Sequence, residues 1–210
     1  MEGMSLRERK KARLRARLIE VSQRLFREQG YHETTLEQIC AEVEVAPQTL
    51  LRYFESKQHL ALAPHFDTLD WYRSEFASRG EGETVLACWR RLISASASRD
   101  PADLRRYHEL LLGTPTLAAA LSAINVEIED LLAAELAKEA GASPGDDLHS
   151  RLLAALLVGG HASVFRHWLD AGGKEPLLPE LLEVVDVAEA AFATRGGPRR
   201  NGGRALRRRR

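Results

Sequence analysis

Two short amphipathic segments separated by a three-residue turn, within residues 35–54, constrain the fold more than any other feature of the chain. Apolar residues recur at helical spacing in both segments, and Pro47 stands at the start of the second, a position that proline favours in helices. Both can share a core with a longer amphipathic segment at 12–29, which ends at Gly30. The sequence therefore predicts a helix-turn-helix inside a three-helix unit. Its inward residues are Leu36, Ile39, Cys40, Val43, Leu50 and Phe54.

The remainder is also predicted to be helical, because leucine and alanine make up 61 of the 210 residues, whereas valine and isoleucine make up 15. This balance favours helices and argues against a large parallel sheet, and so against Rossmann, TIM-barrel and hydrolase architectures. The predicted fold class is therefore all-α. Glycine and proline divide the rest of the chain into predicted helices at 56–79, with a kink at Pro64, and at about 83–98, 101–112, 115–140, 146–171 and 177–195.

The formal net charge is zero, but the charges are unevenly distributed. Residues 1–17 have a net charge of +5 and residues 195–210 one of +8, so the part between them is strongly acidic. Two basic ends on an acidic body indicate that the ends contact a polyanion. Residues 196–210 contain almost nothing apolar, and we expect a disordered basic tail there. Both ends should add salt-dependent affinity for nucleic acid without reading its sequence.

The helix-turn-helix supplies the candidate nucleic-acid contacts. Side chains on the outer surface of its second helix suit base edges and phosphates, and the starts of the flanking helices present backbone N–H groups to phosphate oxygens. Four of the six candidates also have a simpler interpretation: Thr35 is a helix cap in either case, Gln48 could be merely exposed, Tyr53 could only pack, and Lys57 could be a solvated charge. The candidate DNA-binding residues are Thr35, Gln48, Thr49, Arg52, Tyr53 and Lys57.

About 45 residues, from Arg17 to Leu60, also carry a resemblance. They are similar, in order and spacing, to the DNA-binding domain of the TetR/AcrR family of bacterial transcriptional regulators. The resemblance implies an all-α homodimer, in which each subunit has an N-terminal three-helix DNA-binding domain and a larger C-terminal domain that binds an inducer and dimerises. The matching elements are Leu25-Phe26, Gly30-Tyr31, Thr34-Thr35, Ile39-Cys40-Ala41, Val45, Thr49-Leu50, Tyr53-Phe54 and Ser56-Lys57.

Three positions depart from the family pattern. Glu44 stands in the turn where the family usually has glycine, and a left-handed backbone there would cost a non-glycine residue roughly 1–2 kcal/mol. Ala46 replaces the frequent serine and forfeits a helix cap of roughly 1 kcal/mol, which Pro47 partly offsets by presetting φ. Leu51 replaces a common aromatic residue, so Arg52 and Tyr53 are expected to carry more of the DNA contact.

The chain is thus predicted to consist of a basic N-terminal arm at 1–10, a TetR-type helix-turn-helix domain at 11–71, a helical regulatory and dimerisation domain at 72–195 and the tail at 196–210. Parts of the regulatory domain, 99–121 and 165–173, look like those of a TetR subgroup associated with acyl-coenzyme A or similar amphipathic ligands. A pocket among helices needs apolar walls and a few polar groups. The candidate pocket residues are Phe66, Trp71, Trp89, Tyr107, Leu111, His161, Phe165 and Trp168, with Arg105, Arg106 and His108 as further polar groups.

Ordinary core packing is the alternative for each pocket candidate, including His161. The stretch Leu152–Gly160 is apolar on all sides, and so must be covered on every side. Either a second copy of the protein buries one face or the helix lies at the centre of the monomer core; Gly159 and Gly160 similarly allow either close helix approach or room for a ligand. The candidate dimer-interface residues are Leu152, Ala155, Leu156, Gly159, Leu181, Val185 and Ala188.

Other functional classes find little support. Cys40 and Cys88 have no disulfide-framework or metal-ligand spacing, and Cys40 is expected to fill a core position rather than to sense redox state. No P-loop, nucleophile elbow or HExxH motif is present, so we predict neither an enzyme nor a metal or cofactor site. The basic start has no apolar region behind it, and no apolar run approaches a membrane span of roughly 20 residues. A cytoplasmic protein is therefore expected.

These observations predict a ligand-responsive repressor that binds a pseudo-palindromic double-stranded DNA operator as a homodimer and is released by a small hydrophobic or amphipathic inducer, for which an acyl-CoA-like molecule is one candidate. Two alternatives remain. The protein could be an activator or a regulator that does not respond to a ligand. It could also be a helical interaction module that binds nucleic acid without sequence preference.

Overall fold

The computed structural model describes residues 5–96, 100–143 and 147–193, and these residues form ten α-helices and no strand. The predicted all-α fold class is therefore confirmed. The predicted tail and the first four residues of the predicted arm lie outside the described residues. The helices are α1 (Leu6–Gln29), α2 (Leu36–Val43), α3 (Pro47–Leu51), α4 (Lys57–Ala61), α5 (Ala63–Ala77), α6 (Val85–Ser96), α7 (Pro101–Gly113), α8 (Pro115–Glu139), α9 (Leu148–Asp170) and α10 (Leu178–Ala193).

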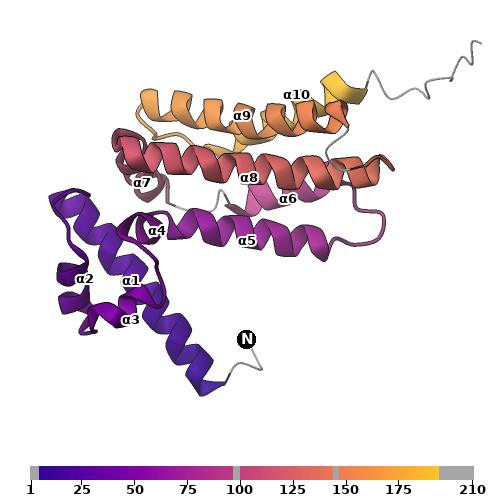
Figure 1. Ribbon diagram of the computed structural model, residues 1–210. Helices are drawn as coiled ribbons and strands as arrows, with labels where there is room; N and C mark the ends of the chain where they lie inside the picture. Colours follow the sequence, from indigo (N-terminus) through magenta and orange to yellow (C-terminus); the bar gives the residue numbers. More distant parts are fainter. Residues whose placement is uncertain (1–4, 97–99, 144–146, 194–210) are drawn as a thin grey trace, which may run out of the picture.

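Helices α1 to α3 form a unit at one end of the molecule, which we call the head, and α5 to α10 form a stack of longer helices, which we call the body (Figure 1). The head has its own core, in which the predicted inward residues of α2 and α3 pack against α1. Burial raises the pKa of the Cys40 thiol, and Glu37 adds to this effect, so Cys40 behaves as an unreactive core residue. The buried members are Leu18, Val21, Phe26, Ile39, Cys40, Leu50 and Phe54.

Helix α1 begins at Leu6, earlier than the sequence pattern predicted. Ser5 and Glu8 form a capping box: the Glu8 backbone N–H donates to the Ser5 hydroxyl at 3.2 Å, and the Ser5 backbone N–H donates to the Glu8 carboxylate at 2.7 Å. Two otherwise unpaired donors are thereby satisfied. The predicted arm at 1–10 is consequently helical from Leu6 onward, and its basic side chains extend from a rigid helix.

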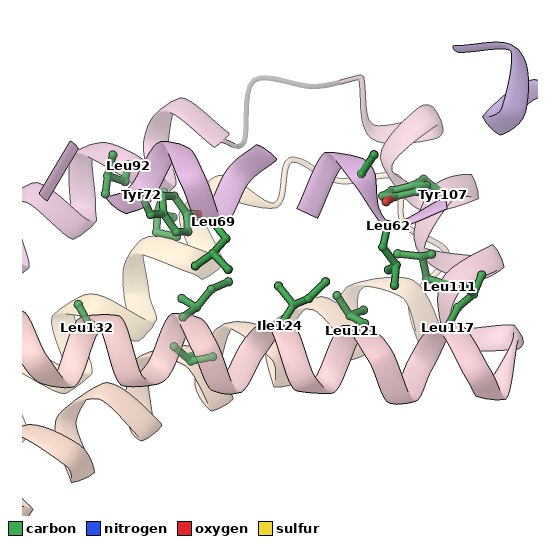
Figure 2. Close-up of a cluster of buried hydrophobic side chains, with 14 of the residues drawn as sticks. Leu62, Leu69, Tyr72, Leu92, Tyr107, Leu111, Leu117, Leu121, Ile124 and Leu132 are labelled. Carbon is green, nitrogen blue, oxygen red and sulfur yellow. The ribbon is translucent and has the colours of Figure 1, made fainter. Parts of the chain in front are cut away.

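The body is built around α8, whose buried apolar residues pack against α5, α6, α7 and α9. Figure 2 shows Leu117, Leu121 and Ile124 of α8 pointing toward Leu62 and Leu69, at the start of α5 and within it. The predicted kink at Pro64 appears as a break at Leu62 between α4 and α5, with the proline in the first turn of α5. Helix α5 is continuous from 63 to 77, so the predicted boundary between residues 71 and 72 falls inside it.

The head and the body share one continuous hydrophobic core, and polar contacts accompany it at their junction. The Arg15 guanidinium donates two hydrogen bonds to the Asp67 carboxylate of α5, at 2.8 and 2.7 Å, and Arg27 lies 3.5 Å from Asp103 of α7. The Gln58 amide donates to the Thr116 carbonyl at 2.9 Å. Partly exposed ion pairs contribute about 0–1 kcal/mol each. These ion pairs therefore add modestly to the apolar packing that holds the head on the body.

Helix α9 is long and apolar enough to span a membrane by length and composition. Its inner face nevertheless packs against α8 and α10, with Leu153, Ala154, Leu157 and Val158 buried there. The same helix is the one whose sequence is apolar on all sides. We therefore assign α9 to the helical body.

Candidate nucleic-acid interface

Thr35 is the N-cap of α2. Its hydroxyl accepts a hydrogen bond from the Gln38 backbone N–H at 3.2 Å, and the Gln38 side chain accepts one from the Thr35 N–H at 2.8 Å. The Thr35 side chain is exposed, and its hydroxyl proton is still available to a phosphate oxygen. The capping role is therefore present, and a phosphate contact is compatible with it.

The turn between α2 and α3 contains the unusual backbone that the sequence indicated. Glu44 has φ 59° and ψ 45°, which is left-handed, and it is the only non-glycine residue with positive φ in the described part of the chain. Ala46 makes no side-chain cap for α3, and Pro47 occupies the first turn. The helix-turn-helix thus folds with two local costs, which the buried side chains of the head offset.

The Glu44→Gly variant is expected to raise the free energy of unfolding by about 1 kcal/mol. Glycine avoids a left-handed penalty of roughly 1–2 kcal/mol but loses more backbone entropy on folding, which reduces the gain. Urea unfolding of the two proteins measures the difference. The matched control is Glu37→Gly within α2, where glycine should lower stability by about 0.5–1 kcal/mol. An unfolding midpoint for Glu44→Gly at or below that of the wild type would contradict this account.

Helix α3 presents one exposed face. Gln48, Leu51 and Arg52 are exposed and lie three and four residues apart, so they share a side of the helix, whereas Leu50 on the opposite side is fully buried. Among the residues that the structure describes, Arg52 has no ion-pair partner. Thr49 and Tyr53 are half-buried at the edges of this face. Helix α3 ends at Leu51, earlier than predicted, and Arg52 and Tyr53 continue into a turn.

Lys57 has a role that the sequence did not indicate. Its ammonium donates to the carbonyls of Tyr31 at 2.8 Å and Thr34 at 2.9 Å, and lies 4.5 Å from the centroid of the Tyr31 ring. The side chain therefore fixes the 31–34 loop, which leads into α2, instead of projecting into solvent. What Lys57 can still offer a phosphate is its backbone N–H, at the first position of α4.

The first turns of α1 carry further basic side chains. They are exposed, and Figure 1 shows this half of α1 projecting past α3. Because the capping box extends α1 to Leu6, these basic side chains lie at helical spacing along one continuous helix. The capping pattern Ser5-x-x-Glu8 was the signal in the sequence that could have predicted this extension. The exposed basic residues are Arg7, Arg9, Lys10, Lys11 and Arg13.

The candidate pocket residues lie in the body and at its junction with the head, but they do not line one cavity. The Tyr107 hydroxyl donates to the Ala61 carbonyl at 3.0 Å, and Leu111 is fully buried beside it (Figure 2). Phe165 packs on His108 with ring centroids 4.1 Å apart, and the Trp168 indole donates to the Glu175 carbonyl at 2.7 Å. These residues therefore occupy core positions in this structure.

Two other candidates lie on α5. The Phe66 ring faces His59 of α4, with centroids 4.9 Å apart, and so lies at the junction with the head. Trp71 is half-buried and its indole donates to the Glu75 carboxylate at 3.1 Å. Arg105 and Arg106 are engaged at the surface of α7, where they pair with Glu109 and Asp103. The ion pairs of Arg105 and Arg106 are exposed, so these two arginines do not line a pocket in this structure.

Trp89 and His161 form the centre of an aromatic cluster in the body. Trp89 is 2% exposed, and its ring lies 5.1 Å from Tyr72 and 5.7 Å from His161. Its indole N–H is the buried side-chain donor without a hydrogen-bond partner in the described part of the chain. Leaving a buried donor unpaired costs about 1–3 kcal/mol, so this N–H is available to an acceptor on a bound molecule.

His161 is held neutral. Its Nε2 lies 3.0 Å from the Leu181 carbonyl, and burial lowers its pKa from 6.5 to about 4. Because the carbonyl can only accept, Nε2 carries the proton and donates it. The folded state therefore binds a proton at Nδ1 of His161 less readily than the unfolded state does. The stability that depends on a neutral His161 is complete above pH 6.5 and is lost as the pH falls toward 4.

Stability should therefore fall between pH 7 and pH 5, and His161 should account for about 2 kcal/mol of the loss. Urea unfolding at the two pH values measures it. The control is His161→Gln, whose side-chain amide can donate to the same carbonyl but does not titrate. Equal losses in the wild type and the variant would show that His161 does not carry the effect.

Two grooves are present on the described part of the surface. One of about 360 Å³ separates α1 of the head from α7 and is bordered by Tyr107, Arg27 and Asp103 among others. The other, of about 650 Å³, lies between α9 and α10. Its lining residues are Leu156, Gly160, Val164, His167, Glu180, Glu183, Val184 and Val187.

The candidate interface residues divide between the surface and the core. Leu152 is 51% and Leu156 37% exposed on α9, Gly159 is exposed and Ala155 is half-buried. The α10 candidates face inward, where α10 packs on α6 and α9, so they are not available to a second copy. The pattern of apolar residues in the sequence shows that α10 is broadly apolar. It does not show which side of α10 packs against the other helices of the same protomer. The inward residues are Leu181, Val185 and Ala188, at 7%, 0% and 0% exposure.

The two glycines of α9 also differ. A Cβ on Gly160 would stand 2.6 Å from the Val184 side chain, so Gly160 permits the close approach of α9 and α10 within one protomer. Gly159 faces open space. Close helix approach is therefore the role of Gly160, and it occurs inside the protomer.

A helix-turn-helix head with an exposed reading face, mounted on a helical body, defines a helix-turn-helix transcriptional regulator. Residues 18–63 match the family model "Bacterial regulatory proteins, tetR family", and residues 84–193 match the model "MftR C-terminal domain". The chain belongs to the TetR family of bacterial regulatory proteins. Members of this family are transcriptional regulators and not enzymes.

Individual relatives agree with this assignment. The chain is 33% identical to the HTH-type transcriptional regulator TcmR of Streptomyces glaucescens over 175 residues, which cover 79% of this chain and 77% of that protein. It is 32% identical to the regulator HbdR of Aromatoleum sp. (strain CIB) over 92 residues, which cover 41% of this chain and 40% of that protein.

Solved structures show the same fold. Thermus thermophilus FadR, a TetR family repressor in complex with lauroyl-CoA, has a TM-score of 0.58 and 23% identity over 83% of this chain and 92% of that chain. SmeT, the repressor of the Stenotrophomonas maltophilia efflux pump SmeDEF, has a TM-score of 0.62 in its triclosan complex, with 20% identity over 85% and 90% of the two chains. At these identities the likeness shows the fold alone.

Proposed function

We propose that the protein is a repressor that binds a pseudo-palindromic operator as a homodimer and is released by a small amphipathic effector. The observation that carries the proposal is the exposed face of α3, where Gln48 and Arg52 stand free of the head's own core. Amide and guanidinium groups read adenine and guanine edges in the major groove. The exposed basic turns of α1 supply phosphate contacts that strengthen binding to any sequence.

Dimer formation is supported by an apolar strip on the outer side of the body. Leu148, Leu152 and Leu156 repeat every four residues on α9 and are 67%, 51% and 37% exposed, and Val187 of α10 is 55% exposed beside the groove. Exposed apolar patches of this kind mark interaction sites, and a two-fold axis would bring the same patch of both copies together. The dimer would place two α3 helices in successive major grooves, roughly 34–36 Å apart.

The effector is proposed to enter the body at the Trp89–His161 cluster. Its apolar part would replace aromatic packing between α5, α6 and α9, and an acceptor atom would satisfy the indole N–H of Trp89. Displacement of α5 would reach the head through Asp67, which binds Arg15. A coupling of about 1–3 kcal/mol is sufficient for release. The acyl-CoA and triclosan complexes of FadR and SmeT support a hydrophobic or amphipathic effector. The proposed operator binding implies that the protein acts in the cytoplasm.

The test is a selection of random DNA duplexes on the purified protein at moderate salt. A palindromic consensus with half-sites about one helical turn apart is expected. Lauroyl-CoA and triclosan are then titrated against the labelled consensus duplex, with release measured by fluorescence anisotropy. Equal binding to all duplexes, lost as salt rises, would overturn sequence-specific regulation; a consensus whose complex resists both probes would overturn release by these effectors.

A further inference from the structure

Leu51 is an unusual residue for the surface of the head. It is 49% exposed, and it is the only large apolar side chain with such exposure between residues 30 and 63, all of which the structure describes. It lies three residues after Gln48 and next to Arg52, on the exposed face of α3. The exposed half of the Leu51 side chain makes no packing contact with the described residues of the protomer, although its neighbours on this face, Gln48 and Arg52, are polar.

The chemistry of the major groove gives this side chain a specific partner. Leucine neither donates nor accepts a hydrogen bond, and the apolar group that DNA displays in the major groove is the 5-methyl of thymine. Against any other base edge, Leu51 would remove water from polar groups without replacing their hydrogen bonds. We propose that Leu51 selects a thymine in each operator half-site by packing against its 5-methyl group. This inference rests on the proposed function as an operator-binding dimer.

The position also differs from that of the family pattern, which has an aromatic residue here. An aromatic residue with a hydroxyl can bind a phosphate, whereas Leu51 cannot. The substitution thus removes a polar contact and introduces an apolar one on the same face, between two side chains suited to adenine and guanine. Phosphate binding is left to the first turns of α1 and to the helix starts at Thr35 and Lys57.

The experiment replaces each thymine of the selected operator, one symmetric pair at a time, with deoxyuridine. This change deletes the methyl group and leaves base pairing and every hydrogen-bonding group in place. Replacement of one particular symmetric pair of thymines is expected to lower the affinity of the wild type about fourfold per half-site, and so about fifteenfold in total. This is the effect that burial of one methyl group in each half-site predicts. The Leu51→Ala variant should bind the methylated and the demethylated operators equally at that position.

Two control variants sharpen the result. Leu112→Ala removes a leucine that is 42% exposed on α7, outside the DNA-binding unit, and should retain the full uracil effect. Thr49→Ser removes the methyl group of Thr49, at the edge of the exposed face of α3, and keeps its hydroxyl. If this variant abolishes the uracil effect while Leu51→Ala retains it, the thymine methyl is contacted by Thr49 and the inference is overturned. If every thymine of the consensus can be replaced by deoxyuridine without loss of affinity, the inference about Leu51 is overturned while the proposed function stands. A wild-type protein without any consensus would overturn the proposed function and the inference with it.

Discussion

Operator binding by the Arg52→Ala variant is expected to be weaker than that of the wild type by about 100-fold or more, with a relaxed preference at one position of each half-site. A well-placed guanidinium discriminates its base pair by about 1–3 kcal/mol, and a dimer uses the contact twice. Arg52 is exposed at the C-terminal end of α3 and forms no ion pair with the described residues, so its loss should not destabilise the head.

The measurement is a titration of the consensus duplex and of a scrambled duplex at one salt concentration. Lys138→Ala is the charge-matched control, because Lys138 is exposed near the end of α8 and pairs with Glu135 of the same helix. Binding of that variant should match the wild type on both duplexes. A loss of similar size on the consensus and scrambled duplexes would mean that Arg52 contributes charge and does not read bases.

The second large effect is expected from Leu152→Glu, which should convert the proposed dimer into monomers and lower operator affinity more than 100-fold. Around a two-fold axis the new carboxylate would appear twice in the same apolar strip, where burying an unpaired charge is far costlier than burying leucine. A monomer retains one reading head and loses the affinity that comes from engaging two half-sites together.

Light scattering coupled to size-exclusion chromatography gives the oligomeric state, and anisotropy gives the affinity. Leu112→Glu serves as the control, since Leu112 is an exposed leucine on α7 outside the strip and should leave the dimer intact. If Leu152→Glu remains a dimer with unchanged operator affinity, the contact between copies lies elsewhere on the body.

Local patterns predicted the architecture of the head well, because buried faces of helices repeat with a period that can be read directly. The inward positions Ile39, Cys40, Leu50 and Phe54 are buried as expected, and Glu44 has a left-handed backbone at the turn position where the TetR/AcrR pattern usually has glycine. The role of Lys57 could not be predicted in this way, because its carbonyl partners lie 23 to 26 residues away in sequence.

Predictions for the body were less specific for a physical reason. The sequence of an apolar helix indicates that the helix must be buried. It does not indicate whether each side is buried by the same chain or by a second copy. Leu152 and Leu181 looked alike in sequence, yet Leu152 is exposed on α9 and Leu181 is buried within the protomer. The pocket candidates show the same limit: aromatic residues that can line a site, such as Tyr107 and Trp168, also pack well when it is closed.

The division of the chain into a head and a body has an evolutionary consequence. The proposed DNA contacts lie in residues 35–57 and the proposed effector site lies in α5, α6 and α9, so we expect that the two specificities can change independently. What must match between them is the apolar packing at the junction and three polar contacts: Arg15 with Asp67, Arg27 with Asp103, and Gln58 with the Thr116 carbonyl. A head transplanted from a relative would have to preserve both for its own operator preference to be joined to this body, and new pairings of signal and gene could then arise by recombination at this junction.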